Sequence, residues 1–294
     1  MKKKIKYIIA GGFASGTSFV SKSLAQDKRL KIIKRKNGAE YNFFVYDRYY
    51  KDKGIKWFEN KFKFQKRVCI DHSSQLFNSI TGIERLAKYN KNIKIILILR
   101  NRIERSWAHY RYSLLNGIEK HNFMNSLKLE KSRLQKMKGH LKTIKPYAYI
   151  DRSNYLFYLN KLLEFFPKKN LLIISSENLK KNPKKNFKKI YKFLNLSFLN
   201  LKNVSNFSSQ YVINRKKQIS LKNYFGTDFN YIIEKIRSEK TDQLKKKFNK
   251  KKIDELKNNL DKSIPEIPKD AKNYLKKIFK KDSKTLKKIT SLDL

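Results

Sequence analysis

The stretch that decides the fold lies near the amino terminus and reads IIAGGFASGTS, from Ile8 to Ser18. It matches the phosphate-loop pattern G-x-x-x-x-G-K-[ST] at every fixed position but one, because Thr17 stands where the pattern has lysine. A strand, a glycine-rich turn and a helix start would aim backbone N–H groups and the helix dipole at an anion. The stretch therefore predicts an anion-binding loop, and a plain tight turn is the alternative.

The missing lysine limits the kinds of ligand that such a loop could bind. In a triphosphatase loop the lysine reaches the β- and γ-phosphates. Thr17 and Ser18 keep the amide cradle and offer two hydroxyls, but they do not replace that charge. We therefore expect the loop to bind one phosphate group rather than a triphosphate with magnesium.

Outside this loop, short apolar runs alternate with helix-like stretches, which is typical of a parallel sheet covered on both faces. The predicted strands are 5–10, 30–34, 67–71, 93–99 and 171–175, and the predicted helices are 17–26, 75–90, 102–117, 153–166 and 183–195. Residues 228–282 are lysine-rich and helical in pattern, with breaks near Pro265 and Pro268. We find no internal repeat and no Gly/Ser linker. The prediction is one α/β domain over residues 1–294, with a P-loop-like central parallel sheet flanked by helices and additional C-terminal helices.

The net charge of +47 over 294 residues suggests nucleic-acid binding, but its source argues against that reading. Of the 71 basic residues 13 are Arg, and Lys, Asn and Ile, which are all frequent here, share A/T-rich codons. The lysines are also spread along the whole chain. A basic protein attracts anionic partners in general. Specific nucleic-acid binding is not expected, because no zinc-finger, basic-zipper or RNA-recognition pattern is present.

Cysteine content and hydropathy indicate the compartment. Cys69 is the only cysteine, so an intramolecular disulfide is excluded and a reducing compartment fits. The start MKKKIKYIIAGGFA resembles a signal peptide, but its apolar run is short and ends inside the predicted loop. No apolar run approaches the ~20 residues that span a membrane. We expect a soluble, cytoplasmic protein without a transmembrane segment.

Arginines cluster where the most apolar strand is predicted to end. Four of the 13 fall in RNRIERSWAHYR, at Arg100, Arg102, Arg105 and Arg111. Arginine binds phosphate through two parallel hydrogen bonds, and ligands of open α/β sheets bind at the carboxyl ends of strands. Arg100 is therefore the best candidate for a second phosphate contact, while Arg105 and the others could simply pair with Glu104 or face solvent.

A lysine-free phosphate loop followed by R-N-x-x-E-R-x-W-x-H-Y resembles the sulfotransferases that use 3′-phosphoadenosine 5′-phosphosulfate (PAPS). Further segments resemble the heparan-type and related bacterial branch in the same order: AEYNFF with KGIKWF, IDHSSQLF, and the long stretch from DRSNY to KFLNL. The closing YLKKIFKKDSKTLKKITSLDL is similar to the usual ending of that branch. The resemblance covers nearly the whole chain.

The resemblance implies a role for individual residues. Gly16, Thr17 and Ser18 would hold the 5′-phosphate of PAPS or of its product PAP, Arg100 would hold the 3′-phosphate, and Glu40 would be the general base. His72, which stands where the family has lysine, would supply a partial cation. Further cofactor contacts are implied at Gly12, Phe13, Ala14, Ser15, Arg102, Ala108 and Arg215. No metal site is predicted.

Several positions depart from the family pattern. Ala14 stands where Lys or Arg is usual, Ala108 where Ser is usual and Arg102 where Pro is usual; Arg102 could compensate for the missing Ser hydroxyl. The expected function is PAPS-dependent transfer of a sulfuryl group to a hydroxyl or amine, with a saccharide as acceptor. The alternatives are a PAP- or glycan-binding relative without catalysis, motivated by Ala14 and Ala108, and a P-loop nucleotide kinase, which Thr17 argues against.

Overall fold

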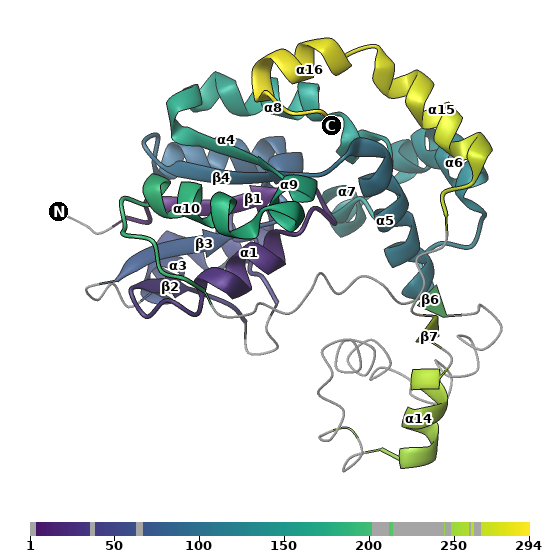
Figure 1. The fold of residues 1–294 in the computed structure, drawn as a ribbon, viewed down its shortest axis with the longest axis horizontal. Helices are drawn as coiled ribbons and strands as arrows, with labels where there is room; N and C mark the ends of the chain where they lie inside the picture. Colours follow the sequence, from purple (N-terminus) through teal and green to yellow (C-terminus); the bar gives the residue numbers. More distant parts are fainter. Residues whose placement is uncertain are drawn as a thin grey trace.

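The computed structural model describes residues 4–35, 39–62, 67–201, 212–213, 244, 248–258, 260–261 and 266–294 (Figure 1). Within these residues the strands of a parallel five-stranded sheet follow the order β2-β3-β1-β4-β5. Their bounds are β1 Tyr7–Gly11, β2 Leu30–Ile32, β3 Val68–His72, β4 Lys94–Leu99 and β5 Leu171–Ser175. A separate antiparallel pair joins β6 Val212–Ile213 to β7 Leu260–Asp261.

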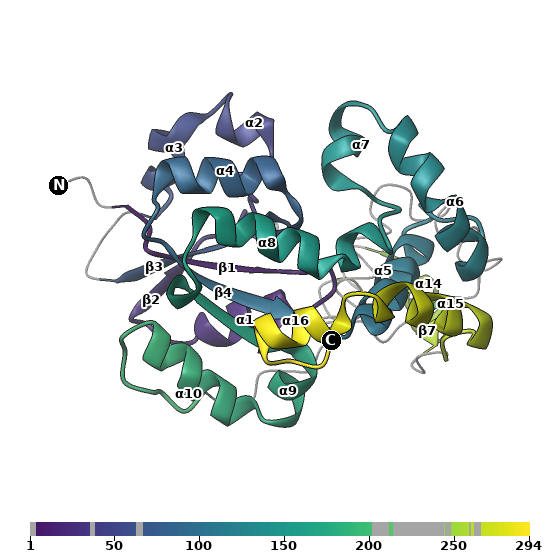
Figure 2. The ribbon, with the colours of Figure 1, turned by 90° about the horizontal axis from the view of Figure 1, so that it is seen from above.

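Helices cover both faces of the sheet because the strands are apolar on both sides. In β4, Ile95, Leu97 and Leu99 pack into one hydrophobic cluster, whereas Ile96 and Ile98 pack into the other. Figure 2 shows α4 and α8 over one face and α1 and α10 over the opposite face. The helices of these two layers and their short connections are α1 Thr17–Leu24, α2 Asp47–Tyr50, α3 Gly54–Asn60, η1 Leu76–Asn78, α4 Ile80–Tyr89, α8 Tyr155–Phe165, η3 Lys168–Asn170, α9 Ser176–Lys181 and α10 Pro183–Phe193.

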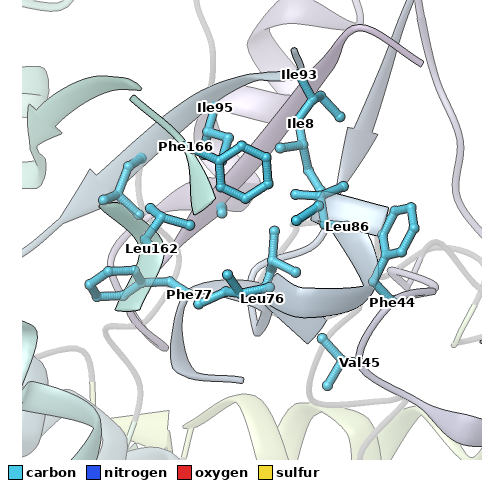
Figure 3. Close-up of a cluster of buried hydrophobic side chains, with 14 of the residues drawn as sticks. Ile8, Phe44, Val45, Leu76, Phe77, Leu86, Ile93, Ile95, Leu162 and Phe166 are labelled. Atoms are coloured by element: carbon cyan, nitrogen blue, oxygen red, sulfur yellow. The ribbon is translucent and has the colours of Figure 1, made fainter. Parts of the chain in front are cut away.

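The larger cluster lies under α4 and α8. Figure 3 shows Ile8 and Ile95 of the sheet facing Leu86 of α4 and Leu162 and Phe166 at the end of α8. All of these side chains are buried. Burying a side chain of this size contributes about 1.5–3 kcal/mol to the free energy of unfolding, so this layer is a main source of stability for the sheet.

A third group of helices lies beyond the carboxyl ends of the strands (Figure 2). Trp107 and Tyr110 of α5, Phe123 of α6 and Leu275 of α15 form a separate buried aromatic cluster there. The elements of this group are α5 Arg102–Leu115, α6 Phe123–Lys136, α7 Gly139–Ile144, η2 Asp151–Ser153 and α15 Lys269–Lys280, and α16 Ser283–Thr290 leads back along α8. The remaining described helix is α14 Lys250–Asn258.

The predicted α/β class with C-terminal helices is confirmed, and each of the five predicted strands is present. The predicted helix 75–90 is divided, because the Ser79 hydroxyl accepts a hydrogen bond from the Gly82 amide and caps a new helix after η1. In the lysine-rich segment, α14 and α15 lie on either side of the predicted proline breaks, while residues 228–243 are outside the described residues. No helix among the described residues is long and apolar enough to cross a bilayer.

Candidate active site

The loop between β1 and α1 forms a tight turn. Gly11 lies so close to β4 that a Cβ there would overlap the carbonyl oxygen of Ile98. The Gly12 amide donates to that same carbonyl (3.2 Å), and the Ser15 amide donates to Gly12 O (3.1 Å). Gly16 then adopts φ 89°, a left-handed conformation that glycine takes without steric cost, and α1 starts at the next residue.

This geometry leaves the amides at the helix start directed outward. Within the described part of the chain, no acceptor receives a hydrogen bond from the amides of Gly16, Thr17 and Ser18. The first N–H groups of a helix have no intrahelical partner, and the helix dipole adds partial positive charge at this end. The loop is therefore built to bind an anion through its backbone.

Arg100 is brought to this loop because β4 is the neighbour of β1 in the sheet. Its Nη1 donates to Ala14 O (3.3 Å), and its Nη2 lies 3.6 Å from a carboxylate oxygen of Glu104. The Tyr155 hydroxyl donates to Arg100 O (3.0 Å) and fixes the backbone at this point. With about a fifth of its side chain exposed, the Arg100 guanidinium remains accessible beside the loop.

Glu40 and His72 are brought together at the end of the next strand, β3. Glu40 Oε1 lies 3.1 Å from His72 Nε2. Glu40 Oε2 accepts hydrogen bonds from the Ser74 amide (2.9 Å), from the Ser74 hydroxyl and from Asn42 Nδ2 (3.2 Å). Because three donors converge on Oε2, the carboxylate is held in one orientation, and its other oxygen is turned toward His72.

His72 does not have the surroundings of a cation. It is fully buried, and burial lowers its pKa below the ordinary value, although the charge of Glu40 acts in the opposite direction. Burial therefore favours the neutral form of the imidazole. This burial argues against the partial cation expected from the sequence, while the position beside Glu40 agrees with the expected pairing.

The neighbouring Asp71 provides a test of this buried environment through pH. Burial, aided by the charge of Glu40, raises the pKa of the Asp71 carboxyl to about 7. The folded protein therefore holds a proton that the unfolded chain releases above about pH 4, so wild-type stability should fall between about pH 4 and 7. Asp71→Asn removes this titration. The free energy of unfolding of the variant, relative to that of the wild type, should therefore rise by up to about 1.4 kcal/mol per pH unit between these pH values.

Urea unfolding of both proteins across this pH range measures the difference. Asp293→Asn, a change at an exposed carboxylate, should leave the wild-type pH profile unchanged. Parallel profiles for wild type and Asp71→Asn would show that Asp71 titrates normally.

Other residues predicted from the sequence are placed differently. The Arg102 guanidinium is buried and turned toward the C-terminal helices, where it contacts Asp282 (2.5 Å), Phe279 O (2.6 Å) and Ser283 Oγ (2.8 Å). Arg102 therefore does not lie beside Arg100 at the loop. This placement does not fit the expectation that Arg102 compensates for the Ser hydroxyl missing at Ala108. Ala108 is buried in α5, and Arg215 lies outside the described residues.

Sequence reasoning did not assign roles to Ser74, Asn42 and Tyr155. Ser74 and Asn42 orient Glu40, and Asn42 adopts φ 47° while its Oδ1 accepts from the Gln75 amide (3.1 Å). All three lie in segments that carry the family resemblance. Their roles depend on contacts across strands, which motif spacing does not reveal.

Together these features define an α/β protein with a P-loop-like fold, in which a glycine-rich loop follows β1 and a fixed carboxylate lies at the end of β3. A family model of the sulfotransferase domain matches residues 4–287, and the chain belongs to this family. No group of three His, Cys, Asp or Glu that could hold a metal ion occurs among the described residues.

Two relatives and one solved structure illustrate the similarity. Heparan sulfate glucosamine 3-O-sulfotransferase 5 of Mus musculus is 29% identical over 193 residues, which are 65% of this chain and 53% of the relative. Bifunctional heparan sulfate N-deacetylase/N-sulfotransferase 1 of Caenorhabditis briggsae is 25% identical over 160 residues, 53% of this chain and 18% of the relative. The chain thus spans about half or less of these proteins. A sulfotransferase from Alicyclobacillus acidocaldarius shares the fold, with a TM-score of 0.59 at 17% identity over 79% of this chain and 96% of that one.

Proposed function

We propose that this protein transfers a sulfuryl group from PAPS to a hydroxyl or amine of a saccharide. One observation carries the proposal: a lysine-free loop, Arg100 and a fixed Glu40 all lie at the carboxyl ends of neighbouring strands of the sheet. A donor with two separate phosphate positions suits a loop and an arginine that approach from different strands.

In this proposal the 5′-phosphate lies on the amides of Gly16, Thr17 and Ser18, and the rest of the loop from Gly12 to Ser15 encloses it. Arg100 binds the 3′-phosphate. Its present contacts with Ala14 O and Glu104 are long (3.3 and 3.6 Å), so a bidentate phosphate contact could replace them at little cost. Ala108 contributes no hydroxyl.

The chemistry follows from the position of Glu40. The acceptor oxygen or nitrogen attacks sulfur, the bond from sulfur to the bridging phosphate oxygen breaks, and PAP leaves with that electron pair. Glu40 accepts the proton that the acceptor loses. As in phosphoryl transfer, positioning and stabilisation of charge would govern such a loose in-line step.

A saccharide acceptor is supported by the names of the two relatives, which both act on heparan sulfate. The excess of basic residues fits an anionic or sulfated chain. Ala14 and Ala108 keep a PAP- or glycan-binding protein without catalysis as the second candidate. The single domain over 1–294 and the cytoplasmic location stay predictions.

Thermal unfolding with ligands tests the donor directly. At a hundredfold excess over Kd, PAP should stabilise the fold by ~2.7 kcal/mol, a shift of roughly 5–10 °C for a chain of this size. ATP with magnesium should shift the melting temperature much less, because the loop has no lysine for a γ-phosphate. A larger shift with ATP and magnesium than with PAP would overturn the proposal in favour of a nucleotide kinase.

A further inference from the structure

Arg152 of η2 is buried next to the loop and forms no ion pair within the described residues. Its side chain is almost wholly inaccessible, and its Nη2 donates to Ile144 O (2.7 Å). Its Nε and Nη1 meet no hydrogen-bond acceptor among the described residues. The guanidinium carbon lies 5.4 Å from the ring centre of Phe13, which belongs to the anion-binding loop.

Two carboxylates in this region, Asp151 and Glu130, form hydrogen bonds with other groups. Asp151 accepts hydrogen bonds from Lys145 Nζ (2.9 Å) and from the Tyr158 hydroxyl (2.9 Å). Glu130 accepts from the amides of Ile150 and Asp151, both at 2.7 Å. No ion pair to Arg152 forms within the described residues. A buried charge without a partner is costly, so the arrangement favours an anion supplied from outside the protein.

Arg152 is linked to the anion loop by a contact and to the segment after Glu40 by its charge. It contacts Phe13 of the loop. The pKa of the Tyr46 hydroxyl is raised, mainly by burial. The charge of Arg152 lowers this pKa to a smaller extent, and the charge of Glu40 raises it. Arg152 thus contacts the loop that would hold the 5′-phosphate, and its charge acts on the segment that follows the proposed base.

We propose that Arg152 binds the sulfuryl group of the donor and takes the place of the cation that Ala14 lacks. This inference rests on the proposed function. In the reaction, the sulfuryl group must lie between the loop phosphate and Glu40, and in this proposal Arg152 binds it through Nε and Nη1, which have no hydrogen-bond partner among the described residues. As the bond from sulfur to the bridging oxygen breaks, negative charge grows on that bridging oxygen, and these donors stabilise it there.

Binding of PAP and PAPS without acceptor tests the assignment, because the two ligands differ only in the sulfuryl group. Arg152→Met should leave the Kd for PAP within about threefold and weaken PAPS about tenfold or more, equivalent to ~1.4 kcal/mol. Arg152→Lys, which keeps the charge but loses the planar fork, should fall between wild type and Arg152→Met. Arg100→Lys is the matched control and should weaken PAP and PAPS equally.

Unfolding of the unliganded proteins separates this role from a structural one. Arg152→Met removes an uncompensated buried charge and keeps the packing volume, so its melting temperature should equal or exceed that of the wild type. Equal weakening of PAP and PAPS, or a clear drop in the melting temperature of Arg152→Met, would overturn the inference. Failure of the wild type to bind PAP at all would instead overturn the proposed function.

Discussion

Glu40→Gln is expected to lower sulfuryl transfer by ~10²–10⁴ while PAP affinity stays within a few-fold. The amide keeps the shape of the side chain but does not accept the acceptor's proton. Among the described residues, no hydrogen bond or ion pair joins Glu40 to the loop or to Arg100, which would bind PAP. Initial rates with labelled PAPS, together with a PAP titration of the same preparation, measure both quantities.

Glu164→Gln serves as the matched control, because Glu164 is half exposed and its ion pair within the described residues is with Lys161. This variant should keep wild-type transfer. Unchanged transfer in Glu40→Gln would remove Glu40 from the mechanism. A parallel loss of PAP affinity in Glu40→Gln would indicate a disturbed fold rather than a missing base.

Asp282→Asn is expected to destabilise the protein by about 3 kcal/mol, the effect of breaking a buried charge pair from one side. Arg102 is 1% exposed, and Asp282 is the only carboxylate paired with it among the described residues. The pair joins the start of α5 to the connection between α15 and α16. Its loss should therefore loosen the C-terminal helices from the edge of the sheet.

Equilibrium unfolding in urea measures this change. Asp293→Asn breaks an ion pair in the same terminal region, but there both side chains are largely exposed and the expected effect is below about 1 kcal/mol. Equal effects from the two substitutions would show that the contact of Arg102 with Asp282 adds little to stability.

Sequence reasoning predicted the sheet because its strands are unbroken apolar runs, as β4 illustrates with residues buried on alternating faces. It also placed Arg100 at the carboxyl end of a strand, where ligands of open α/β sheets bind, and the structure has Arg100 directly after β4. Helices α2 and α3 were not predicted, because short helices rich in aromatic residues and lysine lack a clear period.

The direction of the Arg102 side chain and the protonation of His72 could not be predicted from the sequence, for a different reason. The partner of Arg102 is 180 residues away along the chain, and no local pattern indicates that contact. The pKa of His72 depends on burial at a strand end, and a motif position does not specify how deep a side chain lies. Both features depend on tertiary packing.

Transfer of labelled sulfur from PAPS to a desulfated glycan tests the central claim most directly. Wild-type protein should place label in the glycan fraction, and Glu40→Gln should leave that fraction almost unlabelled. The absence of label with every glycan tried, in a preparation that binds PAP tightly, would contradict the account and favour a binding protein on a sulfotransferase fold.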